Sequence, residues 1–348
     1  MAPLNGGRGV QATHLRRTNE RLVLQCLRRA GEASKADIAR ATHLTSAAVG
    51  GIITDLERMG LIETVGKRQG ARGQPATLMK LNATGAYGIG VRLDRTAIET
   101  ALVDFTGTVL DRRMHDTVLP APEDAIALIL ADITKMLGRL PSHHRSRIAG
   151  VGLAQPFNLE AWLSELDLPA ELFRRWRDVD LRGELERELH FPVTVENDGN
   201  AATIAELFHG LGQAHDDFLY LYMGAAIGGG VVIGGDCLTG SRGNGGDVAM
   251  MLVSPSRLPS TAPARGPHDI LLSRASLKAM DRHLKFHGAA ITGMTARRSA
   301  VEGGGKAVGE WLDDCVDALV PAILNASALL DAPLVVIDSD LGASLLDA

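Results

Sequence analysis

The segment SKADIARATHLTSAAVGGIITDLERMG, residues 34–60, has the spacing of two short helices joined by a tight turn. Ser34 is placed to cap the first helix, and Asp37, three residues later, completes an acidic form of the capping box. Thr45 is placed to cap a second helix that ends at Gly60. This pattern predicts a helix-turn-helix, an arrangement with which many proteins read DNA.

The second helix has two faces of opposite character. Its apolar residues recur at i, i+3, i+4 and i+7 and so point towards a core: Val49, Ile52, Ile53 and Leu56. The opposite face carries almost no side-chain bulk, which suits a helix whose first turns approach base edges and phosphates. The alternative is an ordinary helical hairpin in which the glycines allow close packing. The candidate DNA-reading residues are Thr45, Ser46, Ala47, Gly50 and Gly51.

Two short strands, residues 61–65 and 77–81, are expected after this helix, with a Gly- and Pro-containing basic loop at 66–75 between them. The loop resembles the wing of a winged helix, because its cations can reach phosphates or a narrow minor groove. A charged loop is otherwise an ordinary solvated turn. The candidate contacts in the wing are Lys67, Arg68, Arg72 and Gln74.

Charge separates the two ends of the 348-residue chain. Residues 1–82 hold 13 Lys and Arg against 6 Asp and Glu, which leaves 23 against 35 for the remainder. The first part is therefore +7 and the rest −12, so only the N-terminal part has the electrostatic character of a nucleic-acid partner. Three scattered cysteines predict neither a disulfide framework nor a four-ligand metal site. No long apolar run or secretory leader is evident, so we expect a cytoplasmic protein without a membrane partner.

Periodicity divides the chain into four parts. Residues 1–17 are expected to form a flexible arm, and 18–82 the winged helix-turn-helix domain. After residue 82 the pattern becomes strand-like, and two successive strand-turn-strand openings predict a duplicated α/β architecture with a cleft between two lobes. We assign 83–196 to the first lobe and 197–348 to the second.

Polar groups that could bind vicinal hydroxyls lie beside predicted strands. Asn197 and Asp198 follow a strand, and Asp247 lies in a second glycine-rich stretch. A glycine loop expected at 224–230 could bring backbone N–H groups to a ligand or could be a plain hairpin turn. The candidate effector-binding residues are Asn197, Asp198 and Asp247.

The chain resembles the ROK family of sugar kinases and sugar-responsive repressors from residue 18 to residue 341. The resemblance is carried by VENDGNAA at 195–202 and GAAIGGG at 224–230. It implies an actin-like, ribonuclease H-like fold of two lobes, and the winged helix implies the repressor branch. Asp198 matches the position of the kinases' catalytic base.

Departures from the family pattern disfavour catalysis. The first phosphate loop of the kinases reads Asp-x-Gly-Gly-Thr, whereas residues 92–96 here read RLDRT, and Ala225 replaces a Thr of the second loop. We therefore expect no ATP use, no catalytic residues and no cofactor. No cysteine lies at 254–276, so the family's zinc lacks its usual ligands and no metal is expected. Met250 replaces a sugar-contacting His of the family, and the position of the family's later sugar-binding Glu falls near Leu272.

These observations predict a transcriptional regulator, most simply a repressor of carbohydrate genes, that binds double-stranded operator DNA and responds to a sugar or sugar derivative. One winged helix contacts half a site, so a homodimer or a dimer of dimers is expected. The alternatives are a sugar kinase with an appended DNA-binding domain and a regulator without ligand control. Members of the ROK family usually continue through another helix that closes the first lobe, whereas this sequence ends at Ala348, so the alternatives are a naturally short chain and a truncated one.

Overall fold

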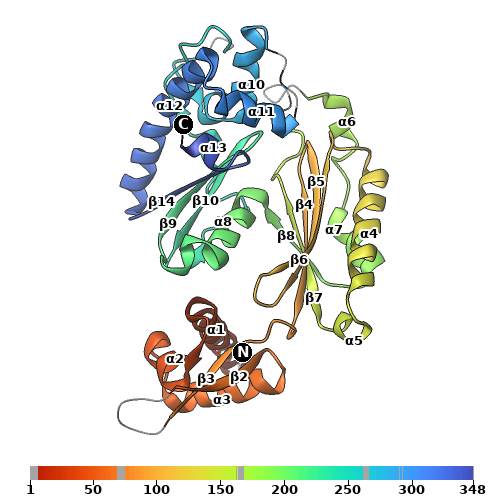
Figure 1. Ribbon diagram of the computed structural model, residues 1–348, viewed down its shortest axis with the longest axis vertical. Helices are drawn as coiled ribbons and strands as arrows, with labels where there is room; N and C mark the ends of the chain where they lie inside the picture. Colours follow the sequence, from red (N-terminus) through yellow and green to blue (C-terminus); the bar gives the residue numbers. More distant parts are fainter. Residues whose placement is uncertain are drawn as a thin grey trace, which may run out of the picture.

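The structure is a computed structural model that describes residues 7–68, 75–161, 163, 168–261, 266–289, 291 and 293–347, with side chains from residue 15 onward. It comprises an N-terminal helical domain and two α/β lobes (Figure 1). Among the described helices, none is long and apolar enough to cross a bilayer.

The N-terminal domain is a winged helix. Helices α1 (Gly7–Ala30), α2 (Lys35–Thr42) and α3 (Ser46–Arg58) pack on a sheet of β1 (Ala33–Ser34), β3 (Ala76–Leu81) and β2 (Ile62–Arg68), in the order β1-β3-β2. The predicted capping box of α2 is confirmed, because the Ser34 hydroxyl accepts from Asp37 N–H and Asp37 accepts from Ser34 N–H. The predicted cap of α3 is confirmed as well, since the Thr45 hydroxyl accepts from Ala48 N–H. The apolar face of α3 is buried in the domain core.

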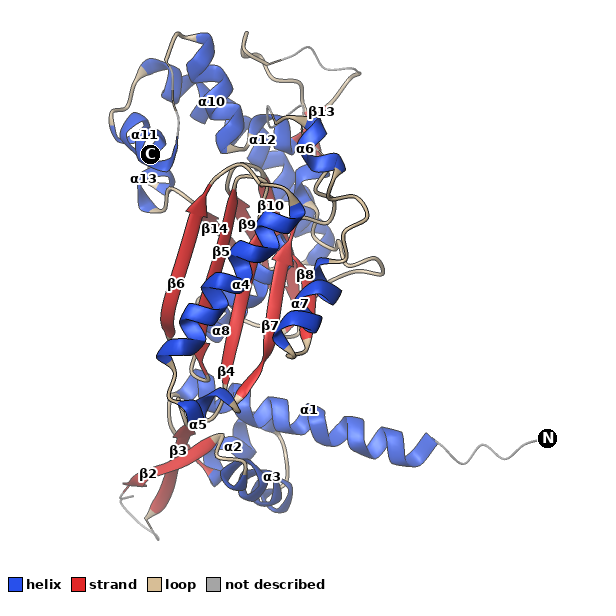
Figure 2. Cartoon of the chain, turned by 90° about the vertical axis from the view of Figure 1, so that its right-hand side faces the viewer, coloured by secondary structure: helices blue, strands red, loops and turns tan. Residues whose placement is uncertain are grey.

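Two boundaries in this domain differ from the prediction. Residues 7–17 belong to α1, which projects from the domain in Figure 2, so the expected arm does not extend over them. Their Gly and Arg content suggested a tail, but from Val10 onward the segment contains good helix formers. Strand β2 also continues to Arg68, so Lys67 and Arg68 lie on a strand and not in a loop. Arg72 and Gln74 lie outside the described residues.

The first lobe is a five-stranded sheet in the order β6-β5-β4-β7-β8. Its strands are β4 (Tyr87–Leu93), β5 (Ala97–Asp104), β6 (Val109–Asp116), β7 (Ile148–Gln155) and β8 (Val193–Asn197). Helices α4 (Pro122–Arg139) and α7 (Leu181–Leu189) pack on one face and bury its core; the shorter α5 (Ser142–Arg145) and α6 (Ala170–Arg174) complete the lobe.

The second lobe begins with α8 (Asp198–His209), directly after the last strand of the first sheet. Its sheet has the order β11-β10-β9-β14, formed by β9 (Phe218–Met223), β10 (Ile227–Ile233), β11 (Asp236–Cys237) and β14 (Val335–Ser339). The outer face is covered by helices whose core surrounds Trp311. The remaining elements are η1 (Leu211–Gln213), η2 (Val248–Met250), β12 (Leu252–Val253), β13 (Asp269–Ile270), α9 (Leu271–Arg274), α10 (Leu277–Phe286), α11 (Gly293–Glu302), α12 (Lys306–Leu330) and α13 (Ala343–Leu346).

The two lobes repeat one topology, as the paired openings predicted. In each, an antiparallel pair is followed by a strand parallel to its first member: β4 pairs with β5 and β7, and β9 pairs with β10 and β14. The expected glycine loop is shorter than predicted, because β10 already begins at Ile227. A Cβ at Gly230 would collide with the Thr203 side chain, so this glycine lets α8 lie directly on the strand.

Candidate functional site

The exposed face of α3 carries only small side chains, and contacts within the chain do not explain why they are small. Ser46, Ala47 and Gly51 are exposed, and a Cβ added at Gly50 or Gly51 would meet no atom within 4 Å outside the helix's own nearby backbone. Each glycine costs about 1 kcal/mol of helix stability relative to alanine. The close-packing explanation for the two glycines is therefore wrong, and the open surface is available to a partner outside the chain.

Asp37 organises the charges beside this face. It binds Ser34 at its cap, and its carboxylate pairs with Arg40 at 2.5 Å and with Arg68 of β2 at 2.6 Å. Hydrogen bonds from the Ser34 hydroxyl and backbone N–H, with a smaller contribution from Arg68, lower the pKa of Asp37 to about 2. Arg68 thus links the wing to α2, while Lys67 beside it is exposed.

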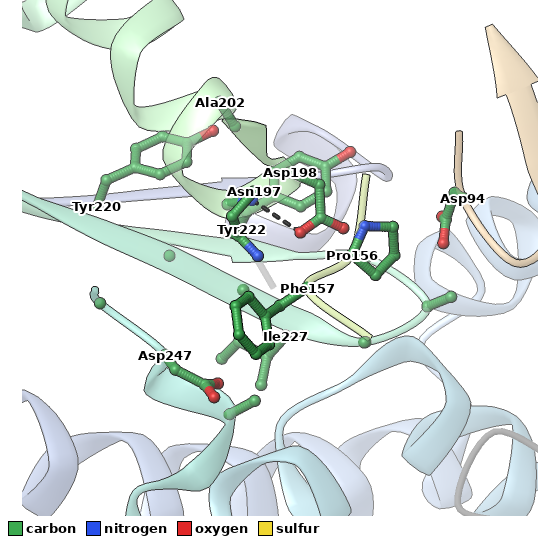
Figure 3. Close-up of a pocket in the computed structure, with 18 of the residues that line it drawn as sticks. Asp94, Pro156, Phe157, Asn197, Asp198, Ala202, Tyr220, Tyr222, Ile227 and Asp247 are labelled. Atoms are coloured by element: carbon green, nitrogen blue, oxygen red, sulfur yellow. Dashed lines mark hydrogen bonds between the residues drawn. The ribbon is translucent and has the colours of Figure 1, made fainter. Parts of the chain in front are cut away.

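A cleft of about 730 Å³ lies between the two lobes. The predicted residues Asn197, Asp198 and Asp247 all line it, as Figure 3 shows. Asn197 caps α8 by accepting from Asn200 N–H, and its amide donates to Asn244 Oδ1 at 3.4 Å. Asn244 in turn donates to Asp247 Oδ2 at 2.9 Å. Asn244, which the sequence reasoning missed, therefore bridges the predicted polar groups, and its place in the Gly-Asn-Gly-Gly-Asp stretch was the available signal.

The carboxyl group of Asp198 lines the cleft at the beginning of α8. Burial raises the pKa of the Asp198 carboxyl, and the nearby Asp94 raises it further. The Gly199 N–H and the guanidinium groups of Arg95 and Arg92 have the opposite effect and lower it. Among the described contacts, its carboxylate accepts a hydrogen bond from Gly199 N–H at 2.9 Å. Its remaining acceptor positions are available to ligand hydroxyls in the cleft.

The charged residues at 92–95 serve the chain's own structure. Arg95 is buried and donates to the carbonyl oxygens of Asn158 and Leu159, at 2.7 and 3.2 Å, so it fixes one loop of the cleft. Arg92 Nη2 lies 3.5 Å from Asp94 Oδ2. Burial lowers the pKa of Arg95, and the two carbonyl oxygens accept from its Nε and Nη2.

Carboxylates from β14 and the residues after it also line the cleft. Asp338 accepts from the Tyr220 hydroxyl at 3.1 Å, and Asp340 accepts from the Tyr222 hydroxyl. Burial, followed by the adjacent carboxylate, raises the pKa of each tyrosine. The sequence reasoning missed both acids, although ligands in open α/β sheets commonly bind at the carboxyl ends of strands.

Comparisons with known proteins agree with this architecture. The model of the ROK family matches residues 88–344, and that of the MarR family matches residues 18–65. The chain is 23% identical over 265 residues to the xylose repressor of Bacillus spizizenii, covering 76% of this chain and 68% of the repressor. It is 32% identical to a glucokinase of Halalkalibacterium halodurans over 170 residues, 48% of this chain and 50% of the kinase.

Solved structures give the same picture of the fold. A ROK family transcriptional regulator described as a homolog of the E. coli MLC protein superposes with a TM-score of 0.70 at 21% identity, over 96% of this chain and 86% of that one. A ROK glucokinase from Streptomyces griseus superposes with a TM-score of 0.59 at 22% identity, over 75% of this chain and 86% of the kinase.

Proposed function

The chain belongs to the ROK family, and on this basis we propose that it is a DNA-binding repressor of genes for sugar uptake or catabolism. In this proposal a sugar or sugar derivative binds in the interlobe cleft and releases the protein from its operator. The xylose repressors among its relatives, and the winged helix joined to the two lobes, support this assignment.

One observation carries the proposal: adjacent residues at the end of α1 contact different lobes. Arg28 donates to the carbonyl oxygens of Phe105 and Thr106 in the first lobe, both at 2.9 Å. Arg29 pairs with Asp216 of the second lobe at 2.5 Å and donates to Gly212 O at 3.2 Å. Helix α1 also packs against α2 and α3 through Val23 and Leu27 of the domain core.

This connection provides a physical route from the cleft to the DNA-facing helix. A ligand that bridges Asp198 of the second lobe and Asp94 of the first, both of which line the cleft, favours one relative position of the lobes. Arg28 and Arg29 are consecutive, so they cannot follow two lobes that move apart without rotating α1 or losing a contact. The ligand then acts by population shift, since it binds the two lobe arrangements with different affinity.

The kinase alternative is weaker because of the charges at the sites of the two loops. Arg92, Asp94 and Arg95 stand where the family has its first phosphate loop. The Gly224 turn lies beside Asp340, because a Cβ placed at Gly224 would lie 3.0 Å from Asp340 Oδ2. The Asp340 carboxylate at the Gly224 turn disfavours the phosphates of a nucleotide. We therefore assign no catalytic residue and no cofactor, and we infer that a homodimer binds two half-sites.

A binding assay with the full-length protein tests the function. DNA flanking the protein's own gene is titrated at several salt concentrations, and a panel of sugars and sugar phosphates is then added. We expect tight, strongly salt-dependent binding to one fragment and its release by one class of sugar. Sugar-dependent ADP formation from ATP, absent in Asp198→Asn, would instead establish the kinase.

A further inference from the structure

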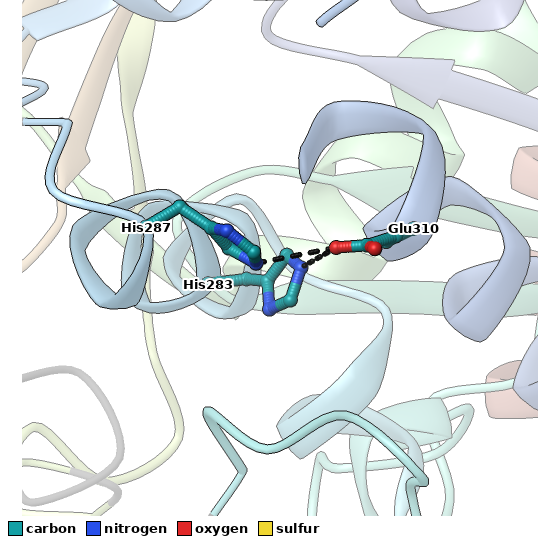
Figure 4. Close-up of side chains that lie close together, drawn as sticks. All are labelled: His283, His287 and Glu310. Carbon is teal, nitrogen blue, oxygen red and sulfur yellow. Dashed lines mark hydrogen bonds and ion pairs between the residues drawn. The ribbon is translucent and has the colours of Figure 1, made fainter. Parts of the chain in front are cut away.

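Three ligand-type side chains converge in the second lobe, away from the cleft. His283 Nε2 and His287 Nε2 each lie 3.2 Å from the same oxygen of Glu310, Oε2 (Figure 4). One nitrogen from each ring and one carboxylate oxygen all lie within 4.8 Å of one another. His283 is fully buried, while His287 and Glu310 are about one-third exposed.

The backbone fixes this convergence. His283 lies in the last turn of α10 and His287 caps its C-terminus, so the spacing of four residues puts both rings on one face. The packing of α10 against α12 brings this face to Glu310, near the beginning of α12. The rings meet nearly edge to face, with planes 71° apart and centroids 4.7 Å apart.

The missing cysteines led to the expectation of no metal, but at this different place in the fold we propose that His283, His287 and Glu310 form a binding site for a divalent transition metal, of which Zn²⁺ is the representative. Two ligand atoms bound to a tetrahedral zinc at about 2.0–2.1 Å are separated by about 3.3 Å, close to the two distances from the histidine nitrogens to Glu310. His287 lies at a helix end and its side chain is 37% exposed, so its ring has room to bring its nitrogen to the same separation from the His283 nitrogen.

The surroundings of His283 orient it for this role. Its Nδ1 lies 2.8 Å from the Ser260 hydroxyl, so a proton on Nδ1 has an acceptor and the Nε2 lone pair is directed towards Glu310. Metal-bound histidines characteristically donate their second nitrogen to such a partner. Glu310 Oε1 lies 3.4 Å from Lys306 Nζ, which leaves Oε2 for the metal.

The donor set distinguishes between classes of cation. Two imidazoles and one carboxylate suit zinc and related transition metals, whereas Mg²⁺ prefers oxygen ligands. Three protein ligands would leave a fourth position of a tetrahedral zinc for water. The metal would tie α10 to α12 and stabilise the helices that cover the second sheet, because it binds the folded state preferentially.

Zinc titration of the full-length, chelator-treated protein tests the site by calorimetry, elemental analysis and thermal unfolding. We expect one Zn²⁺ per chain, a higher unfolding temperature with Zn²⁺ and no comparable effect of Mg²⁺. Cobalt substitution should give the visible absorption of a four-coordinate site. A parent protein that binds no stoichiometric zinc and shows no zinc-dependent stabilisation overturns the proposal without any variant.

Variants then assign the ligands. His287→Gln removes a partly exposed ligand and should weaken zinc binding by about 100-fold. Its matched control is His215→Gln, at an exposed histidine of the same lobe, and should bind zinc like the parent. Glu310→Gln should also lose the cobalt absorption. Unchanged zinc affinity in His287→Gln, or equal loss in His215→Gln, would refute the assignment.

Discussion

At the scale of single residues, Asp198 is where we expect ligand control to be concentrated. Asp198→Asn keeps nearly the same shape but removes the charge, and losing a charged hydrogen-bond partner costs about 1.5–3 kcal/mol. Effector affinity should fall by about 10- to 150-fold, while operator binding without effector is unchanged. Effector titrations of the protein–DNA complex measure this. Asp313→Asn, an exposed change on α12, is the control. A response equal to that of the parent would place the ligand elsewhere.

The substitution Gly50→Ala adds one methyl group and tests the stability of α3 separately from its binding to DNA. Because a Cβ there meets open space, Gly50→Ala should stabilise α3 by about 1 kcal/mol. If the bare face approaches DNA, the same change should weaken operator binding. Gly138→Ala, in α4 and equally open, should stabilise without affecting DNA. Denaturant unfolding and DNA titration give the two quantities. Increased stability with undiminished operator binding would remove Gly50 from the interface.

At the scale of elements, the capping box of α2 makes the winged helix sensitive to acid. The pKa of Asp37 is lowered from 3.8 to about 2 in the folded state, so its contribution is fully present above pH 3.8 and is lost as the pH falls towards 2. The difference in unfolding free energy between the parent and Asp37→Asn should therefore shrink over this window. Urea unfolding followed at several pH values measures it. A constant difference would show that the carboxylate charge does not stabilise α2.

At the scale of the whole molecule, the paired contacts of Arg28 and Arg29 connect the lobes to the winged helix. Arg29→Gln removes the ion pair with Asp216 of the second lobe. Since exposed ion pairs contribute little to stability, the fold should persist. Coupling between sites is typically worth about 1–3 kcal/mol, so the effector's influence on operator affinity should fall several-fold. Comparison of operator affinity with and without effector tests this, and Arg298→Gln, at an exposed arginine of α11, is the charge control. An unaltered effector response would require another route.

The sequence determined much of the local structure, because the decisive signals are local. The capping box at Ser34, the cap at Thr45 and the apolar stripe of α3 are interactions within a few residues, and all three are confirmed. The strand-turn-strand openings similarly predicted the repeated topology of the lobes. The family motifs at 195–202 and 224–230 predicted the fold before any tertiary contact was known.

Tertiary structure decided what depends on neighbours distant in the chain. The glycines of β10 resembled a loop, whereas in the structure Gly230 lies on a strand where a Cβ would collide with Thr203 of α8. The continuation of β2 to Arg68 depends on its pairing with β3, which local composition does not reveal. Arg28 and Arg29 acquire a role only because two lobes meet at the end of one helix. His283, His287 and Glu310 converge only because α10 packs on α12, and a spacing of four residues between two histidines cannot by itself identify the third ligand.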